Sequence, residues 1–190
     1  MGDRYEVRPW FASPPGEVRG SALVLPGGGY TVDHPALFWA CQVLVQVGWE
    51  VTTMRWDAGG ITDAECRSFV ERGAQLLDAE AGDGQTLVLA KSLGSYAAAW
   101  ASDRGYPAIW LTPVMTDPFV ADALSHYAAP SLLIGGASDR LWANPSGRPS
   151  DQTVLELAEV DHALHRADWR GSLVALDDAL TAIETFAAAV

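Results

Sequence analysis

Four short apolar segments constrain the possible folds more than any other feature of this sequence. Residues 21–25, 86–90, 108–112 and 131–135 are apolar at nearly every position, without the alternation of a half-exposed strand. Such runs are typical of strands buried on both faces, as in a parallel sheet that helices cover on two sides. Two less uniform segments, VTTMRW and TVLELAEV, predict two more strands.

Helical patterns separate these strands. Residues 34–47 carry apolar side chains at helical spacing, and residues 62–81 open with the Thr-x-x-Glu pattern of a capping box. Further helices are expected at residues 92–103, 117–127 and 169–189. The alternation predicts a three-layer, doubly wound α/β fold whose mostly parallel sheet has about six strands.

The length of the chain, 190 residues, predicts one domain over residues 1–190. A chain of this size buries about 70% of its unfolded surface, so it can form a core without a disulfide or a metal. Its hydrophobic fraction of 49% excludes a largely disordered chain. Within residues 1–20, we expect a short edge strand followed by a Pro-Gly turn.

The charge balance argues against nucleic acid and anionic membranes as partners. Twelve basic residues face 24 acidic ones, which leaves a net charge of −12 and repels phosphate groups. No apolar run approaches the ~18 residues of a membrane span. The oligomeric state stays open at this point.

Cysteine usage and the first residues bear on the compartment. Cys41 and Cys66 belong to no CxxC motif or Cys/His cluster, so neither a disulfide framework nor a metal site is expected. The first residues lack the apolar region of a secretory signal. We therefore expect a cytoplasmic protein.

The strongest local signal is the segment AKSLG at residues 90–94. A buried strand ends there, Ser92 follows, and an Ala-rich helix begins. This is the strand-turn-helix context of a nucleophile elbow, usually written G-x-S-x-G, in which a strained turn exposes the serine hydroxyl. The alternative is that Ser92 only caps the helix that follows it.

A glycine-rich loop, PGGGY at residues 26–30, follows the first buried strand. Consecutive glycines let backbone N–H groups reach a cavity, as an oxyanion hole requires. A flexible turn and a dinucleotide-binding loop are the alternatives, and the second lacks its GxGxxG pattern.

Two further polar residues follow predicted strands. Asp139 comes after residues 131–135, and His162 comes after the last strand. Together with Ser92 they follow the chain order Ser, Asp, His that is typical of one class of catalytic triad. Because the carboxyl ends of parallel strands meet at one edge of the sheet, we expect the three side chains to converge.

With these motifs in place, the chain resembles the α/β-hydrolase superfamily, especially its small, lidless members related to dienelactone hydrolases. The resemblance runs from about residue 21 to the end of the sequence and rests on PGGGY, AKSLGS, TPVMTDP, GGASDRLW and VDHALH in that order. It implies a trimmed α/β-hydrolase fold without a cap domain and without a cofactor. It also implies Ser92 as nucleophile, His162 as base and Asp139 as the acid that orients the base.

The resemblance extends to the oxyanion hole. It implies the N–H of Leu93 as one donor and Gly28 or Gly29 as the source of the other. The sequence departs from the family pattern where Ala90 replaces a glycine and Pro26 replaces a histidine, and most of the first antiparallel strands of the larger fold are missing.

Competing residues exist for each role. Asp117, in TPVMTDP, is the alternative acid, and His34 and His165 are alternative bases. Ser95 is expected inside the helix rather than at the nucleophile position. A Ser-Lys pair with Lys91 is disfavoured, because adjacent residues leaving a strand point to opposite sides.

The pocket and the reaction follow as expectations. Tyr30, Trp56 and Trp142 are expected to line a pocket for a flat or apolar acyl or alcohol group. The favoured function is a serine hydrolase, specifically a carboxylesterase that acts on small or accessible esters through an acyl-enzyme. The alternatives are a non-catalytic binding protein with the same fold, and an acyltransferase or thioesterase that uses the same nucleophile.

Overall fold

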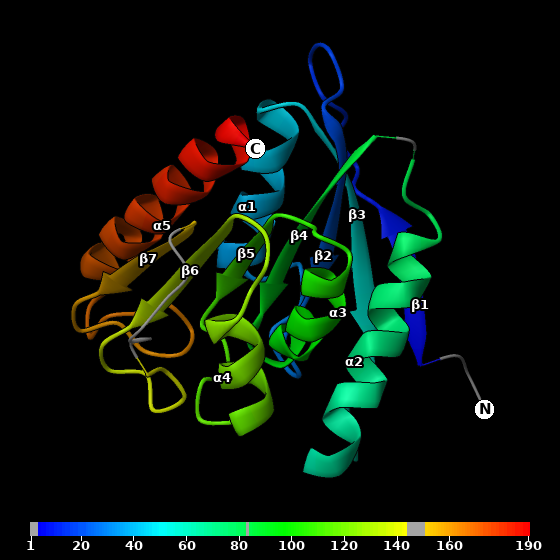
Figure 1. The fold of residues 1–190 in the computed structure, drawn as a ribbon. Coiled ribbons are helices and arrows are strands. Elements are labelled where there is room, and N and C mark those ends of the chain that lie inside the picture. Colours follow the sequence, from blue (N-terminus) through cyan, green and yellow to red (C-terminus); the bar gives the residue numbers. More distant parts are fainter. Residues whose placement is uncertain (1–3, 83, 144–150) are drawn as a thin grey trace.

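The computed structural model describes residues 4–82, 84–143 and 151–190. The remaining residues of the predicted domain, 1–3, 83 and 144–150, lie outside the described residues. Within the described part, one sheet stands between two layers of helices (Figure 1).

The sheet has seven strands in the order β1-β3-β2-β4-β5-β6-β7. Their bounds are β1 (Tyr5–Pro9), β2 (Gly20–Leu25), β3 (Trp49–Trp56), β4 (Gln85–Lys91), β5 (Ala108–Leu111), β6 (Ser131–Gly136) and β7 (Gln152–Leu157). All neighbouring strands are parallel except β1, which pairs antiparallel with β3 at one edge. The mostly parallel, doubly wound sheet is therefore confirmed, and the strand beyond the expected six is the N-terminal edge strand.

Helices cover both faces of the sheet. On one face, α1 (Pro35–Gln46) packs beside α5 (Trp169–Ala189). On the other lie α2 (Asp63–Asp78), the 3₁₀ helix η1 (Ser92–Ala97), α3 (Ala98–Asp103) and α4 (Pro118–Ser125) (Figure 1). Two apolar clusters fill the spaces between the sheet and these layers. Every residue of β2, β5 and β6 is buried, which explains their continuous apolar sequences.

The connections place a topological switch point between β2 and β4. The chain leaves β2 through α1 toward β3, and it returns through α2 on the opposite face to β4. In open α/β sheets, binding sites form beyond the carboxyl ends of strands at such a point. The glycine-rich loop follows β2 and Ser92 follows β4, so both lie there.

The helix expected at residues 92–103 differs in form from the prediction. Its first half is the 3₁₀ helix η1, and only Ala98–Asp103 is α-helical. The tight first turn follows from the packing of Gly94 against β2, where a Cβ would lie 2.7 Å from the carbonyl oxygen of Leu25. None of the described helices is long and apolar enough to cross a membrane.

Candidate active site

Ser92 occupies a strained turn at the end of β4. Its φ is 50°, in the left-handed region that few non-glycine residues adopt. The Ser95 hydroxyl donates to the Ser92 carbonyl oxygen at 2.6 Å and accepts from the N–H of Val114 at 3.1 Å. Strain of this kind persists only where surrounding contacts enforce it, and it clusters at functional sites. The structure thus places Ser92 in a strained turn between β4 and η1.

The ring of His162 connects Ser92 to Asp139. Its Nε2 lies 2.7 Å from the Ser92 Oγ, and its Nδ1 lies 2.8 Å from the Asp139 Oδ2. Because an ionised carboxylate can only accept, this contact requires a proton on Nδ1, and the Nδ1–H group donates a hydrogen bond to the Asp139 Oδ2. The Nε2 lone pair is then free to accept from the Ser92 hydroxyl. The structure thus brings together the three side chains that the sequence placed after three different strands.

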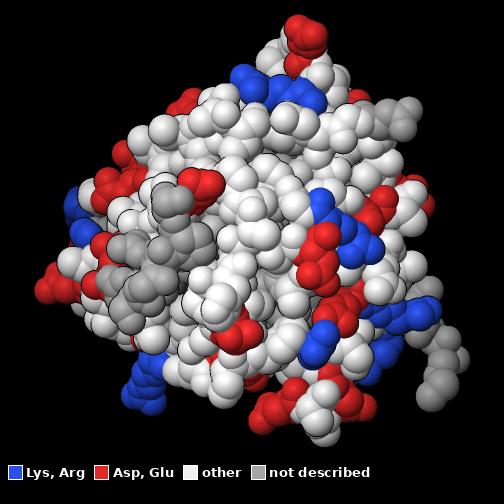
Figure 2. Space-filling model, viewed as in Figure 1, with Lys and Arg blue, Asp and Glu red and all other residues white. Residues whose placement is uncertain are grey.

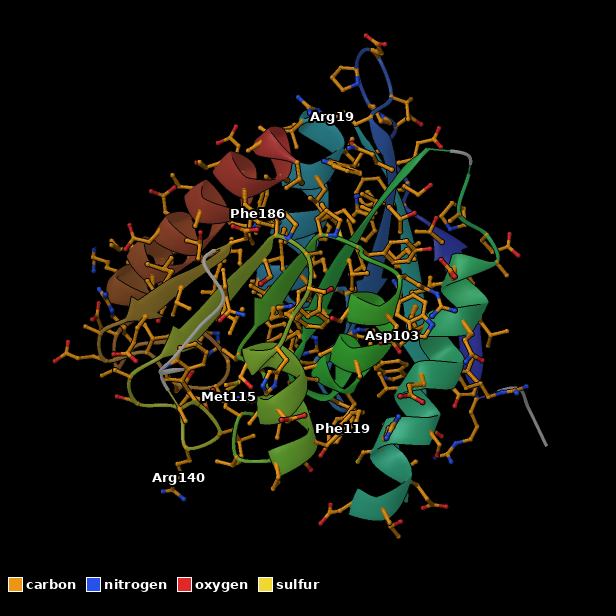
Figure 3. The ribbon with its side chains drawn as sticks, viewed as in Figure 1. Arg19, Asp103, Met115, Phe119, Arg140 and Phe186 are labelled. Atoms are coloured by element: carbon orange, nitrogen blue, oxygen red, sulfur yellow. The ribbon has the colours of Figure 1, made fainter. Side chains whose placement is uncertain are left out.

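The Asp139 loop is shaped to hold its carboxylate beside His162. The Asp139 side chain is fully buried, and its Oδ1 accepts from the N–H of Leu141 at 2.9 Å. A Cβ on Gly136 would lie 2.1 Å from the carbonyl oxygen of Val160, so only glycine allows the end of β6 to approach this segment. The loop is also tied to the one after β5, because the N–H of Met115 donates to the Leu141 carbonyl oxygen at 2.8 Å. Figure 3 shows Met115 near α4, on the side of the molecule where Arg140 lies.

A compact turn presents His162 after β7. The Asp161 carboxylate accepts from the N–H groups of Ala163 and His165, at 2.9 and 2.8 Å. The N–H of Asp161 donates to the His165 carbonyl oxygen at 2.9 Å, which closes the turn. His165 therefore helps to form the turn through its backbone, whereas His162 points its ring at Ser92.

The glycine-rich loop lies against Ser92. The N–H of Gly27 donates to the Tyr30 carbonyl oxygen and its own carbonyl accepts from the Trp56 indole, both at 2.9 Å. Within the described part of the chain, the N–H groups of Gly28 and Gly29 donate to no protein acceptor. Both glycines line the same hollow as Ser92 and Leu93, with a volume of about 460 Å³.

The remaining wall of this hollow is mostly apolar. It is formed by Ala58, Gly59, Ile61, Cys66, Tyr96 and Val114. Burial raises the pKa of the Cys66 thiol, and burial together with a hydrogen bond to Asp117 raises the pKa of Tyr96. Both groups are therefore neutral near pH 7, and the wall carries no ionised side chain.

Asp117 and His34, predicted as alternatives, have other partners. The Asp117 carboxylate caps α4 by accepting from the N–H of Phe119 at 2.8 Å, and it accepts from the Tyr96 hydroxyl at 2.7 Å. The His34 Nδ1 accepts from the N–H of Thr31 at 3.0 Å at the start of α1. In the described structure, it is Asp139 and not Asp117 that contacts His162.

The three aromatic side chains expected in the pocket do not line the hollow at Ser92. The Trp56 indole supports the glycine-rich loop, and the Trp142 indole donates to Glu156 at 2.8 Å while its ring covers Gly135. The Tyr30 hydroxyl accepts from the N–H of Ala36 at 3.0 Å. Indole and phenol groups need polar partners when they are partly buried, and those partners direct the rings elsewhere.

Tyr30 instead belongs to a second hollow of about 410 Å³. This hollow lies between the start of α1, the turn after His162 and the first turns of α5, and His165 and Trp169 also line it. Trp169 is 62% exposed. Tyr30 therefore lines this second hollow and not the one at Ser92.

One polar contact near Ser92 escaped the sequence analysis. Lys91 is completely buried at the end of β4, and its Nζ donates to the Thr112 hydroxyl and to the carbonyl oxygen of His162. The one available signal is a lysine placed directly between an apolar strand and Ser92. Its hydrogen bonds do not include the Ser92 hydroxyl, so the disfavoured Ser-Lys pair is not formed.

Two remaining features are the surface charge and the arrangement of side chains that can bind metal ions. Figure 2 shows acidic side chains spread over the visible face, with basic side chains in small separate groups. Within residues 4–82, 84–143 and 151–190, no cluster of three or more His, Cys, Asp or Glu side chains is arranged to hold a metal ion.

Comparison with known proteins supports the fold at low sequence identity. Neither a scan of protein-family models nor a search of curated proteins finds a match. Among solved structures, the chain is similar to an alpha-beta serine hydrolase homologue from Coxiella burnetii, with a TM-score of 0.72, 14% identity, and 95% of this chain and 90% of that chain covered. It is also similar to Est1E from Butyrivibrio proteoclasticus with ferulic acid bound, at a TM-score of 0.71 and 13% identity, with 96% and 94% covered.

A third similar structure bears on the cap domain. A serine hydrolase without a lid from Xanthomonas campestris matches at a TM-score of 0.61 and 16% identity, with 95% of this chain and 86% of that chain covered. These likenesses show that the chain has the α/β-hydrolase fold without a lid. The resemblance inferred from the motifs is confirmed at the level of the fold.

Proposed function

We propose that this chain is a serine hydrolase, and specifically a carboxylesterase, with Ser92 as nucleophile, His162 as general base and Asp139 as the acid that orients His162. The observation that carries the proposal is the unbroken chain of hydrogen bonds from the Ser92 Oγ through the His162 ring to the Asp139 carboxylate, at 2.7 and 2.8 Å. If Ser92 only capped the helix that follows it, this series of hydrogen bonds would not be needed. Nucleophile, base and orienting group in mutual contact are the arrangement that activates a serine.

The reaction proceeds in two halves. The Ser92 Oγ attacks the ester carbonyl carbon while its proton passes to the His162 Nε2, and the carbonyl oxygen becomes an oxyanion. The N–H groups of Leu93 and of Gly28 or Gly29 stabilise that charge. Collapse of this intermediate breaks the bond to the alcohol oxygen, which takes the proton from His162. Water then attacks the acyl-Ser92 ester with His162 again as base, which releases the acid and restores the serine.

The hollow at Ser92 supports small, neutral acyl groups as substrates. Among the described residues that line it, none is Lys, Arg, Asp or Glu. Its volume of about 460 Å³ lies within the usual range for small-molecule sites. A net charge of −12 further disfavours strongly anionic substrates.

The wider setting belongs to the same proposal. We place the enzyme in the cytoplasm as one domain over residues 1–190, with a small-molecule ester as partner and no nucleic acid. The described cysteines, Cys41 and Cys66, are both free and buried, which accords with a reducing compartment. Cell fractionation tests the location directly.

Labelling with a fluorophosphonate, followed by peptide mass spectrometry, tests the nucleophile. We expect the wild-type protein to be labelled at Ser92, Ser92→Ala to remain unlabelled, and His162→Ala to label at least ~100-fold more slowly because the base is lost. Circular dichroism on each variant controls for folding. A folded wild-type protein that resists the probe would overturn the proposal in favour of a non-catalytic binding protein.

The reaction class needs a second assay. Short-chain aryl esters and thioesters are compared by kcat/KM, and product analysis in the presence of alcohol acceptors detects acyl transfer. We expect free acid as the main product and esters as the better substrates. A dominant transferred product, or a preference for thioesters, would replace the carboxylesterase assignment while keeping the nucleophile.

A further inference from the structure

The buried amino group of Lys91 contacts the main chain of His162. Lys91 is the last residue of β4, directly before Ser92, and none of its surface is exposed. Its Nζ donates to the carbonyl oxygen of His162 at 2.7 Å and to the Thr112 hydroxyl, also at 2.7 Å. It lies 4.4 Å from the centre of the Tyr30 ring. An ammonium group has three N–H donors. Two of them are used in these hydrogen bonds, and the Tyr30 ring adds a cation–π contact.

The last residue of β4 and the first residue of η1 thus contact the same histidine at two points. Ser92 meets the His162 ring at Nε2, and Lys91 meets the His162 backbone carbonyl. Because β4 is hydrogen-bonded to β2 and β5 in the middle of the sheet, it is a rigid reference for the loop after β7. The contact bridges 71 residues of sequence. It therefore connects the His162 backbone to the residue directly before Ser92.

We propose that Lys91 is a positioning residue, which holds the backbone of His162 so that its Nε2 stays within hydrogen-bonding distance of the Ser92 hydroxyl. This inference rests on the proposed serine hydrolase function. A buried lysine is costly unless it is fully paired, so a purely packing role would be served better by an apolar side chain. A misplacement of about 1 Å between reacting groups can cost 100-fold in rate.

The charges around Lys91 are compatible with an ammonium group. Burial lowers the pKa of Lys91 to about 8, while the Asp139 and Asp161 carboxylates oppose that shift. Tyr30, whose own pKa is raised by burial, is neutral near pH 7. Lys91 is thus mostly protonated at neutral pH, and a charge-assisted hydrogen bond to the His162 carbonyl is stronger than a neutral one.

The test compares Lys91→Met with Thr112→Val. Methionine has nearly the length of lysine but no donor and no charge, so it removes the contact to His162. Valine matches threonine in shape but has no hydroxyl group. Thr112→Val therefore removes the hydrogen bond between Lys91 and Thr112 and leaves the one to the His162 carbonyl oxygen. For each variant we would measure Tm, the rate of fluorophosphonate labelling at Ser92, and kcat and KM for an aryl ester.

We expect Lys91→Met to lower the labelling rate and kcat by about 10- to 100-fold with KM within about twofold. Thr112→Val should lower Tm while its labelling rate stays within about threefold of wild type. A folded Lys91→Met protein that is labelled at the wild-type rate would overturn the inference. Equal rate losses in both variants, in proportion to Tm, would also overturn it, because they would indicate only a structural role.

Two controls keep the result interpretable. If Lys91→Met does not fold, Lys91→Gln takes its place: the amide reaches less far, fills most of the space and is expected to show the same rate loss. The downfield proton resonance of the His162 Nδ1–H should broaden in the variants that lose the contact, and an unchanged resonance would count against the inference. A wild-type protein without labelling would refute the proposed function itself, which separates the two failures.

Discussion

Asp117 and Asp139 are two aspartates with different tasks at the same edge of the sheet. Both follow a buried strand, and both accept a backbone N–H group two residues further along the chain, from Phe119 in α4 and from Leu141. The second oxygen of Asp139 reaches His162, whereas that of Asp117 is bonded to the Tyr96 hydroxyl. The two aspartates therefore differ in the partner of their second carboxylate oxygen. This difference decides which aspartate can orient the proposed base.

Substitution of each aspartate distinguishes these tasks. Asp139→Asn should lower kcat by about 1,000- to 10,000-fold, because an amide can donate to Nδ1 and favour the wrong tautomer of His162. Asp117→Ala should leave kcat within a few-fold but lower the free energy of unfolding by about 1 kcal/mol through the lost helix cap. Steady-state kinetics and urea denaturation measure the two effects. The reverse pattern would transfer the acid role to Asp117.

The junction of β4 and η1 is the element that exposes Ser92. The chain turns at Ser92 with a φ of 50°, and the following 3₁₀ turn packs onto the end of β2. Gly94 is required there because a Cβ would lie 2.7 Å from the carbonyl oxygen of Leu25. A strained non-glycine conformation costs about 1–3 kcal/mol, which neighbouring contacts must offset. The close approach of η1 to β2 is one such contact.

Enlarging Gly94 tests this junction. Gly94→Ala should lower the free energy of unfolding by about 1–3 kcal/mol, since the added methyl group pushes against backbone rather than a flexible side chain. The rate of probe labelling at Ser92 should fall as well, because the turn shifts. Gly16→Ala is the control: no atom lies within 4 Å of its added Cβ, and a change within about 0.5 kcal/mol is expected. Equal stability of the two variants would contradict this account of the turn.

The whole molecule combines a tightly packed interior with a strongly acidic surface. On each side of the sheet, apolar side chains from the strands and from the covering helices form one buried cluster. Against this, 24 acidic residues face only 12 basic ones, for a net charge of −12. The resulting self-repulsion favours expanded states, and dissolved salt screens it. Stability at low ionic strength is therefore expected to be below its value in physiological salt.

Thermal unfolding at several salt concentrations measures this repulsion. At pH 7, Tm should rise by a few degrees between about 0.01 and 0.15 M NaCl, as the Debye length falls from roughly 30 to 8 Å. Potassium chloride should act equally, because screening depends on ionic strength and not on a specific ion. A Tm that stays constant or falls with salt would show that local ion pairs outweigh the net repulsion.

Local pattern was sufficient for most of the architecture. A strand buried on both faces is apolar at nearly every position, so the sequence shows β2, β4, β5 and β6 as almost continuous apolar runs. The boundaries of α5 agree with the predicted 169–189, because its apolar stripe extends over the whole segment. The helix after Ser92 was predicted less well, since the 3₁₀ turn depends on a backbone contact with β2 that lies far away in the sequence.

The sequence by itself determined the order of strands and helices, the small residues at the turn after β4, and the order of Ser92, Asp139 and His162 along the chain. Only the tertiary structure decided which groups meet: that Asp139 rather than Asp117 reaches His162, that Lys91 contacts the His162 backbone, and that the predicted pocket aromatics find partners elsewhere. The physical reason is that the apolar pattern of a strand or helix depends on residues that are close together in the sequence. A hydrogen bond across some 70 residues depends instead on how the elements pack, and packing sets the distance between its atoms.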